Sequence, residues 1–552
     1  MAAASPQPDG PKPKGPPDFS NATPKMTPST LEGESEEARL ERLGRQRPDK
    51  LPSIWSEIGF VYSVTMSQGL TEYFVSGFDV ILPTVVKELN IPSTSKTWPA
   101  NAFSLVIACF LLTFGRLGNK DMHGGYPVYV GGIAWFTIWS FIAGWSQNEL
   151  MMDICRALGG LGPAAYLPTG LMLLGSYYRP GPRKNMVFAI YGAMAPLGFY
   201  CGIFFAGIAA QFTTWRWYFF IGTILSLSTA VVAYFAIPSD REDRKGMGIK
   251  MDWWGAILIS VGLVLVVYAI TDSSNAPHGW ATPYIYVLLI VGVLLLAAAV
   301  YVEGWVAEQP LLPFDIFDVK YMKPLCAALL FSYGSLGVFL LYTTFYMTNI
   351  MGGEPLQLVA WFTPMALGGC IISTVGGLVL HRIPGTGIII LAGLAWIIAP
   401  LLFAIAPHGA NYWAYTFPSM ICATIAIDLT FTVTNVFFTT SLPLKRQGLA
   451  GALINTLVQL SIAIFLGFAD VTASNTADLG LMKSYKAVFW LEVAMAGLAQ
   501  VLMVGFVKLK PATSDLTADE KAALEMAEAE ARGNAQDAAA REGGGEKMQE
   551  HA

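Results

Sequence analysis

The sequence predicts an all-α membrane protein with fourteen membrane-spanning helices. Three observations lead to this prediction. Only 13% of the 552 residues are charged and 54% are hydrophobic, whereas a soluble domain carries about 25% charged residues. Apolar runs of about 20 residues, long enough to cross a bilayer, recur along the chain. The basic residues gather in alternate loops. These features favour a multi-pass membrane protein that uses the lipid bilayer as its solvent.

The apolar runs define the expected spans, which lie near 59–86, 97–115, 126–146, 150–177, 186–210, 216–237, 252–271, 283–303, 324–350, 356–380, 387–406, 411–440, 448–470 and 486–508. A charged segment, 239–252, separates the first six spans from the rest. If the seventh and eighth spans are an inserted pair, two bundles of six remain. We therefore expect a disordered tail (1–55), an N-terminal six-helix bundle (56–238), a linker with two extra central spans (239–323), a C-terminal six-helix bundle (324–510) and a polar tail (511–552).

The distribution of basic residues predicts the orientation of the chain. One set of loops holds fourteen Lys and Arg residues, including Arg116, Arg183 and Lys445, and the other set holds five. Basic loops stay in the cytosol, so both termini are expected there. We expect a plasma-membrane protein, with the vacuole or another internal membrane as the alternative.

Polar residues inside the spans are the candidates for function. Arg156 lies well within an apolar run, where a charge costs several kcal/mol unless it is paired or hydrated. Gln68, Glu72 and Asp79 share one face of the first span, and Asp79 lies at a depth similar to that of Arg156. We therefore expect an ion pair between Asp79 and Arg156 across a central cavity. Asp153, one turn before Arg156, is the alternative partner.

Proton coupling is assigned first to Glu72, which lies nearer the midplane. A carboxyl there can take up and release a proton as its surroundings alternate between wet and dry. The alternative is a neutral, hydrogen-bonded Glu72 with a purely structural role. In the second half, Asp428 and Asn435 share a face of the twelfth span and complete the predicted cavity. Glu492, near the end of the last span, is expected to be a surface or interface charge.

Four short motifs resemble those of a known family. They are Gly115-Arg116-Leu117-Gly118 followed by Asp121 and Gly124, Arg156 with Gly160 and Gly162, Gly192 with Pro196, Gly198 and Gly202, and Trp215-Arg216-Trp217. Together they resemble the major facilitator superfamily, and the last motif resembles its fourteen-span drug:proton antiporters, within a fungal branch that includes aminotriazole- and boron-resistance pumps.

The resemblance assigns roles to several of these residues. It implies a major facilitator fold, a gating loop around Gly115, Asp121 and Gly124, and an antiporter-motif helix carrying Gly192, Pro196, Gly198 and Gly202. The acid position of the loop falls on Asp121 if two residues are inserted, or on Asn119 if they are not. Gly198 and Gly202 form a GxxxG pair that lets helices approach closely.

The expected function is proton-coupled export of small organic or toxic compounds by alternating access. The alternatives are a proton symporter that imports a metabolite or siderophore, and a membrane receptor or scaffold without transport activity. The sequence has no phosphate-binding GxxxxGK[ST] loop and no catalytic or metal-ligand pattern, so we expect neither an enzyme nor a metal or other cofactor. The expected partners are a small-molecule substrate, protons and the bilayer, with no nucleic acid and a monomeric state.

Overall fold

Fourteen long helices make up the described part of the protein. The computed structural model describes residues 45–92, 94–118, 124–178, 182–239, 251–379, 384–442 and 447–509. All fourteen helices are long and apolar enough to cross a membrane, which confirms the predicted spans. They are α2 (Ile54–Glu88), α3 (Trp98–Leu117), α4 (Gly125–Ala143), α5 (Glu149–Tyr177), α6 (Pro182–Phe212), α7 (Arg216–Ala236), α8 (Trp253–Asp272), α9 (Pro283–Tyr301), α10 (Met322–Asn349), α11 (Pro355–Val379), α12 (Gly385–Ile405), α13 (Phe417–Ser441), α14 (Gln447–Asn475) and α15 (Leu481–Phe506).

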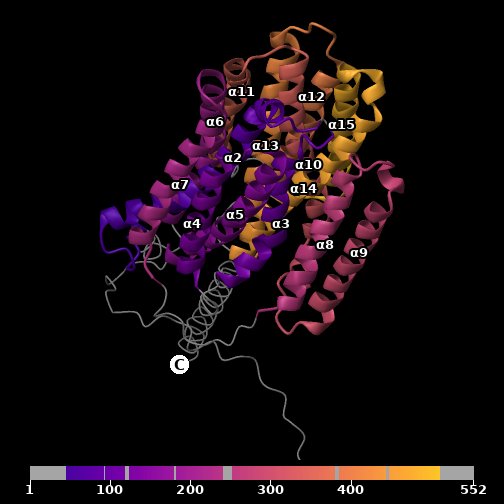
Figure 1. The fold of residues 1–552 in the computed structure, drawn as a ribbon. Helices are drawn as coiled ribbons and strands as arrows, with labels where there is room; N and C mark the ends of the chain where they lie inside the picture. The colour runs from indigo at the N-terminus through magenta and orange to yellow at the C-terminus, as the bar shows by residue number, and fades with distance from the viewer. Residues whose placement is uncertain are drawn as a thin grey trace, which may run out of the picture.

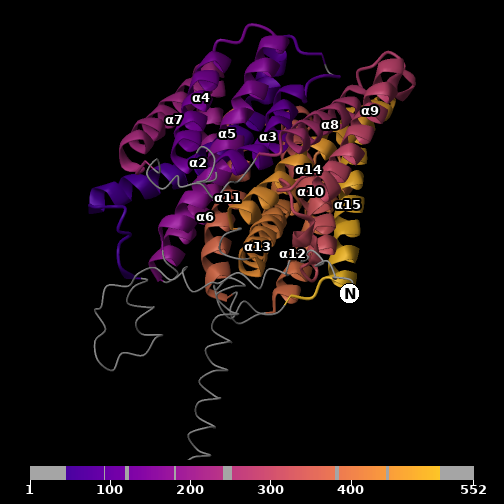
Figure 2. The ribbon, with the colours of Figure 1, turned by 90° about the horizontal axis from the view of Figure 1, so that it is seen from below.

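The helices form two bundles and one added pair. Helices α2–α7 pack among themselves as the N-terminal half, and α10–α15 as the C-terminal half. Figure 2 shows these halves side by side, with α6 beside α11. Helices α8 and α9 pack on each other, and α8 lies against both α3 and α14 (Figure 1). The inserted pair therefore covers one seam between the halves.

The two faces of the bundle are named here by the ends of the chain. Because the number of spans is even, α2 begins and α15 ends on the same side, which we call the tail side. The opposite side, where α2 ends and α3 begins, is the far side. The expected tail disorder over residues 1–44 and 511–552, and the acid Asp121, lie outside the described residues.

Glycines allow a close helix contact in the N-terminal half, between α2 and α6. A Cβ atom on Gly198 would lie 2.2 Å from the Gly69 carbonyl oxygen, and one on Gly202 would lie 2.5 Å from the Tyr73 carbonyl oxygen. Only glycine therefore lets the two backbones come this close. The GxxxG pair read from the sequence is the site of this contact. A Cβ atom on Gly192, six residues earlier on α6, would meet no atom within 4 Å among the described residues, apart from its own stretch of helix.

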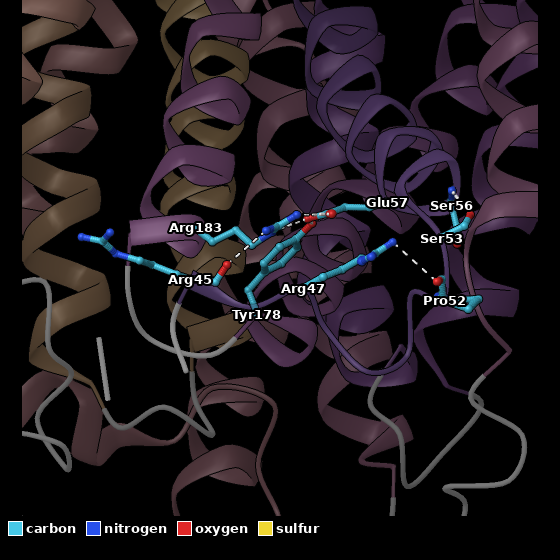
Figure 3. Close-up of polar contacts among 8 residues, drawn as sticks. All are labelled: Arg45, Arg47, Pro52, Ser53, Ser56, Glu57, Tyr178 and Arg183. Carbon is cyan, nitrogen blue, oxygen red and sulfur yellow. Dashed lines mark hydrogen bonds and ion pairs between the residues drawn. The ribbon is translucent and has the colours of Figure 1, made fainter. Parts of the chain in front are cut away.

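A polar cluster on the tail side joins three helices of the N-terminal half (Figure 3). The Arg183 guanidinium forms a two-pronged ion pair with the Glu57 carboxylate, with Nε donating to Oε1 at 2.7 Å. The Tyr178 hydroxyl donates to the same oxygen at 3.0 Å, and Arg183 Nη1 donates to the Arg45 carbonyl at 3.1 Å. The bond to Glu57 holds the pKa of Arg183 above its ordinary value. The cluster ties the segment before α2 to the adjoining ends of α5 and α6.

Candidate functional site

A cavity of about 990 Å³, including its open parts, lies where the two halves meet. Helices α2, α5 and α6 line it from the N-terminal half, and α10, α11, α13 and α14 from the C-terminal half. Most of its wall is apolar. Its polar lining residues are Gln68, Thr71, Glu72, Tyr333, Thr424, Asp428, Asn455 and Gln459. The cavity therefore presents a few polar groups on a largely apolar surface, the usual character of a small-molecule site.

The N-terminal wall of the cavity holds Glu72 in a short hydrogen-bond chain. The Tyr191 hydroxyl of α6 donates to Gln68 Oε1 at 2.9 Å, and Gln68 Nε2 donates to Glu72 Oε1 at 3.3 Å. The i, i+4 spacing of Gln68 and Glu72 on α2 makes this contact possible. Gln68 is thus oriented by Tyr191 so that its amide nitrogen faces the carboxylate. Glu72 is held in place and still faces the cavity.

The C-terminal wall places Asp428 near the antiporter-motif helix. A Cβ atom on Gly369 of α11 would lie 3.1 Å from Asp428 Oδ2 and 3.2 Å from the Cβ atom of Pro196. Gly369 thus lies between a carboxylate of one half and the helix α6 proline of the other. Within the described part of the chain, no hydrogen bond to the Asp428 carboxylate is found. The cavity therefore brings together Glu72, Gln68, Asp428 and Pro196 of the predicted site residues.

Arg156 lies away from this cavity, in the core of the N-terminal half. Its guanidinium is sandwiched between the rings of Phe78 and Phe103, at 4.1 and 4.2 Å from their centroids. Its Nε donates to the Pro99 carbonyl and its Nη1 to the Phe74 carbonyl, both at 3.0 Å. The side chain is 4% exposed. Arg156 thus joins α2 and α3 to α5.

The expected ion pair between Asp79 and Arg156 is not formed. Among the described residues no carboxylate lies within the 4.0 Å ion-pair distance of Arg156, and this applies to both Asp79 and Asp153. The guanidinium is instead held by two backbone carbonyls and two aromatic rings, and Asp79 acts on it only through its charge. Asp79 is 8% exposed and is absent from the cavity lining described above.

We expect Arg156→Lys to destabilise the protein without changing the affinity for substrate. A lysine keeps the charge but loses the planar group that stacks on both rings and the fork that reaches two carbonyls. Losing one hydrogen bond from a buried charged group costs about 1.5–3 kcal/mol. Thermal unfolding in detergent measures the loss. A variant of unchanged stability with weakened substrate binding would instead place Arg156 in the binding site.

The remaining predicted residues are dispersed. Asn435 lies on α13 outside the cavity lining, and its Nδ2 donates to the Phe431 carbonyl at 2.9 Å. Gly115 lies in the last turn of α3, where a Cβ atom would be 3.6 Å from that of Ala452 in the other half. Gly124 caps the start of α4 with a φ of 88°, which favours glycine. Of the predicted gating-loop residues that the structure describes, Gly115 lies at the boundary between the halves.

Two carboxylates of the C-terminal half differ from the expectation. Glu492 is a buried residue of α15 with 0% exposure, and among the described residues neither of its carboxylate oxygens has a hydrogen-bond partner, so its assignment as a surface or interface charge is wrong. Asp470 of α14, which was not among the predicted site residues, is 6% exposed and accepts a hydrogen bond from the Tyr342 hydroxyl at 2.8 Å. The signal that could have drawn attention to Asp470 is an isolated acid at the end of a span, since such a residue needs a partner if the helix continues.

Comparison with known proteins identifies relatives for most of the chain. A family model described as Major Facilitator Superfamily matches residues 64–466. The chain is 37% identical to "Low affinity ammonium transporter" of Saccharomyces cerevisiae (73% of this chain, 79% of the relative). It is 30% identical to "Efflux pump terJ" of Aspergillus terreus (87% and 92%) and 30% identical to "Aminotriazole resistance protein" of Saccharomyces cerevisiae (82% and 84%).

A solved structure supports the fold. The crystal structure of a variant of the nucleoside transporter NupG superposes with a TM-score of 0.56, over 82% of this chain and all of that one. The sequence identity is 12%, so this likeness concerns the fold alone.

Proposed function

Because the chain belongs to the major facilitator superfamily, as its motifs indicated, we propose that it is a proton-coupled transporter that exports small organic compounds by alternating access. Members of this superfamily move small molecules across membranes, and the relatives of this chain include an efflux pump. To this general activity the proposal adds coupling to protons, the direction of substrate transport and the residues that carry the proton. The observation that carries it is the central cavity, which brings Glu72 of one half and Asp428 of the other to the same space.

The contacts between the halves support alternating access. On the tail side, a Cβ atom on Gly451 of α14 would lie 2.6 Å from Leu171 of α5. On the far side, the Leu356 backbone amide of the C-terminal half donates to Gln211 Oε1 of the N-terminal half at 2.9 Å. Close contacts therefore flank the cavity on both sides. If each set parts while the other holds, the cavity opens to one side of the membrane at a time.

Glu72 is the residue to which we assign the proton. A carboxyl at membrane depth that lacks a basic partner is stable mainly in its neutral form and can ionise when water enters the cavity. Among the described residues that line the cavity there is no Lys, Arg or His. Glu72 has a fixed hydrogen-bond donor in Gln68, which supports either charge state. Asp428 is the second candidate, and Pro196 lets α6 bend beside it.

The remaining features of the proposal concern placement in the cell. The excess of basic residues in the tail-side loops supports a cytosolic location for both termini. We propose the plasma membrane as the site and a monomer as the working unit. The halves are proposed to extend over 56–238 and 324–510, with the inserted pair within 239–323.

Transport into or out of proteoliposomes under an imposed pH gradient tests the proposal. Vesicles are loaded with aminotriazole, borate or another small toxic compound, and the outside is made acidic. Antiport predicts that the inward flow of protons accelerates substrate efflux, and that collapsing the gradient with a protonophore removes the acceleration. Substrate movement in the same direction as the protons would establish symport, and indifference to the gradient would refute proton coupling.

A second candidate function is the uptake of a small cation. It is favoured by the 37% identity to a relative described as a low affinity ammonium transporter and by the cavity's two carboxylates without a basic lining residue. Labelled methylammonium in the same vesicles distinguishes the two. Uptake of methylammonium by wild-type protein, with no efflux of the toxic compounds, would support this candidate over export.

A further inference from the structure

Three aromatic rings of the C-terminal half gather on the far side, away from the central cavity. They are Tyr342 and Phe345 of α10 and Tyr485 of α15, called here the aromatic cage. The rings of Phe345 and Tyr485 are nearly parallel, with a 13° angle between their planes and 6.5 Å between their centroids. The Tyr342 ring stands at 90° to Phe345 and at 82° to Tyr485. The three rings thus form two parallel walls and a perpendicular one.

The ammonium group of Lys96 lies at this cage. Lys96 belongs to the other half, in the segment between α2 and α3. Its Nζ is 4.4 Å from the Phe345 ring centroid, 5.3 Å from that of Tyr485 and 5.8 Å from that of Tyr342. A cation within about 6 Å of an aromatic face is attracted by the ring's electron density. Lys96 Nζ lies within this distance of all three ring centroids.

A buried carboxylate completes the cluster. Asp470 of α14 accepts hydrogen bonds from the Tyr342 hydroxyl at 2.8 Å and from the Thr97 hydroxyl. Burial lowers the pKa of Lys96, and the charge of Asp470 counteracts part of that shift. The carboxylate therefore stabilises a cation held at the rings.

The cluster is divided between the two halves of the protein. Lys96 and Thr97 come from the N-terminal half, and the cage and Asp470 come from the C-terminal half. We propose that the aromatic cage and Asp470 form a binding site for small primary ammonium ions, and that Lys96 is its tethered occupant in this conformation. A primary ammonium, the group that Lys96 itself places there, suits the site because its charge is attracted by the rings and by the Asp470 carboxylate.

The site has a consequence for the transport cycle. If the far-side ends of the halves part, Lys96 leaves with its own half and exposes the cage to free cations. That consequence rests on the proposed alternating access, whereas the binding site itself does not. An external ammonium ion would then compete with Lys96 and favour the conformation that is open on the far side.

Chemical rescue of Lys96→Ala tests the binding site. The substitution removes three carbons and the ammonium of the side chain, so n-propylammonium matches the missing part. We expect the variant to unfold at a lower temperature than the wild type in detergent, and n-propylammonium to restore the midpoint in a saturable way, since a ligand that binds only the folded state stabilises it. Its neutral analogue n-propanol is expected to have little effect.

One further variant and the wild type control for binding elsewhere, including at Glu72 and Asp428. In the double variant Lys96→Ala, Asp470→Asn, the apparent affinity for n-propylammonium is expected to fall at least about tenfold. The wild type, with its cage filled, is expected to respond weakly. Equal stabilisation of all three proteins, or rescue by n-propanol as strong as that by n-propylammonium, would overturn the proposal.

A pair of full-length variants covers the case in which Lys96→Ala does not fold. Lys96→Arg keeps the charge at the cage, and Lys96→Met keeps most of the chain without the charge. If the charge is what the site binds, the arginine variant unfolds near the wild-type temperature and the methionine variant well below it. The same midpoint for both would show that no cation is required there and would overturn the proposal. These measurements need no transport, so they can fail or succeed independently of the exporter hypothesis.

Discussion

Replacing Glu72 with glutamine is expected to reduce gradient-driven transport at least about tenfold, equivalent to about 1.4 kcal/mol. Glutamine has nearly the same shape and can keep a hydrogen bond with Gln68, which donates to Glu72 Oε1 at 3.3 Å. It cannot take up or release a proton. The loss should therefore concern coupling, while binding of the substrate and its exchange without a gradient persist. The measurement is efflux from proteoliposomes with and without the imposed pH gradient.

A matched control is available in Glu354→Gln. Glu354 is an exposed carboxylate just before α11 that accepts a hydrogen bond from Gln211 at 3.3 Å, outside the cavity. A glutamine there can accept the same bond through its Oε1, so the far-side contact of Gln211 with Leu356 is preserved and coupling should stay intact. Asp428→Asn is the informative companion. If Glu72→Gln transports normally under the gradient and Asp428→Asn does not, the proton belongs to Asp428 and the assignment to Glu72 is wrong.

The spans were predictable because hydrophobic length is a strong signal in a membrane protein. With no water in the bilayer core, each crossing segment must satisfy its own backbone and be apolar for about 20 residues. The first span begins earlier in the structure than hydropathy predicts. The structure begins that helix at Ile54, where Ser53 accepts a hydrogen bond from the Ser56 backbone amide as an N-cap, a capping residue that hydropathy does not detect.

The site was predictable where one helix decides the geometry. Gln68 and Glu72 face the same cavity because the i, i+4 spacing on α2 places them on one side of that helix. The pairing of Asp79 with Arg156 failed because depth along two helices fixes height in the membrane but not the rotation of one helix relative to its neighbour. That rotation follows from packing, which places Phe78 and Phe103 on the guanidinium.

The carboxylates of the last two spans illustrate the same limit. The predicted thirteenth span ended at Asp470, which made that acid look like an ordinary boundary residue. The helix continues to Asn475, so Asp470 becomes a buried side chain that needs Tyr342 and Thr97 as donors. Glu492 was expected at the surface because it lies near the end of a predicted span. In the structure, α15 packs between α10 and α12. Distance from a helix end does not reveal which neighbours cover it.

The second large effect is expected from Gly198→Ala, which should destabilise the N-terminal half. An added methyl group would lie 2.2 Å from the Gly69 carbonyl oxygen and 2.5 Å from the Gly69 Cα atom. These are backbone atoms, so no side chain can rotate away to make room, and α2 and α6 must separate. Overpacking of this kind typically costs about 1–3 kcal/mol. We expect a lower unfolding temperature in detergent and a smaller yield of folded protein.

The same helix supplies the control that isolates this contact. Gly192→Ala adds the same methyl group to α6 at a position where no described atom outside its own stretch of helix lies within 4 Å. Alanine is preferred to glycine within a helix by about 0.5–1 kcal/mol, so this variant should be as stable as the wild type or slightly more so. The two substitutions are therefore expected to have opposite signs. If both lower the unfolding temperature equally, the sensitivity lies in α6 as a whole, and the close approach of α2 and α6 is not the reason for glycine at position 198. If Gly198→Ala alone does so, the contact that positions Glu72 on α2 beside Pro196 on α6 depends on a single missing methyl group.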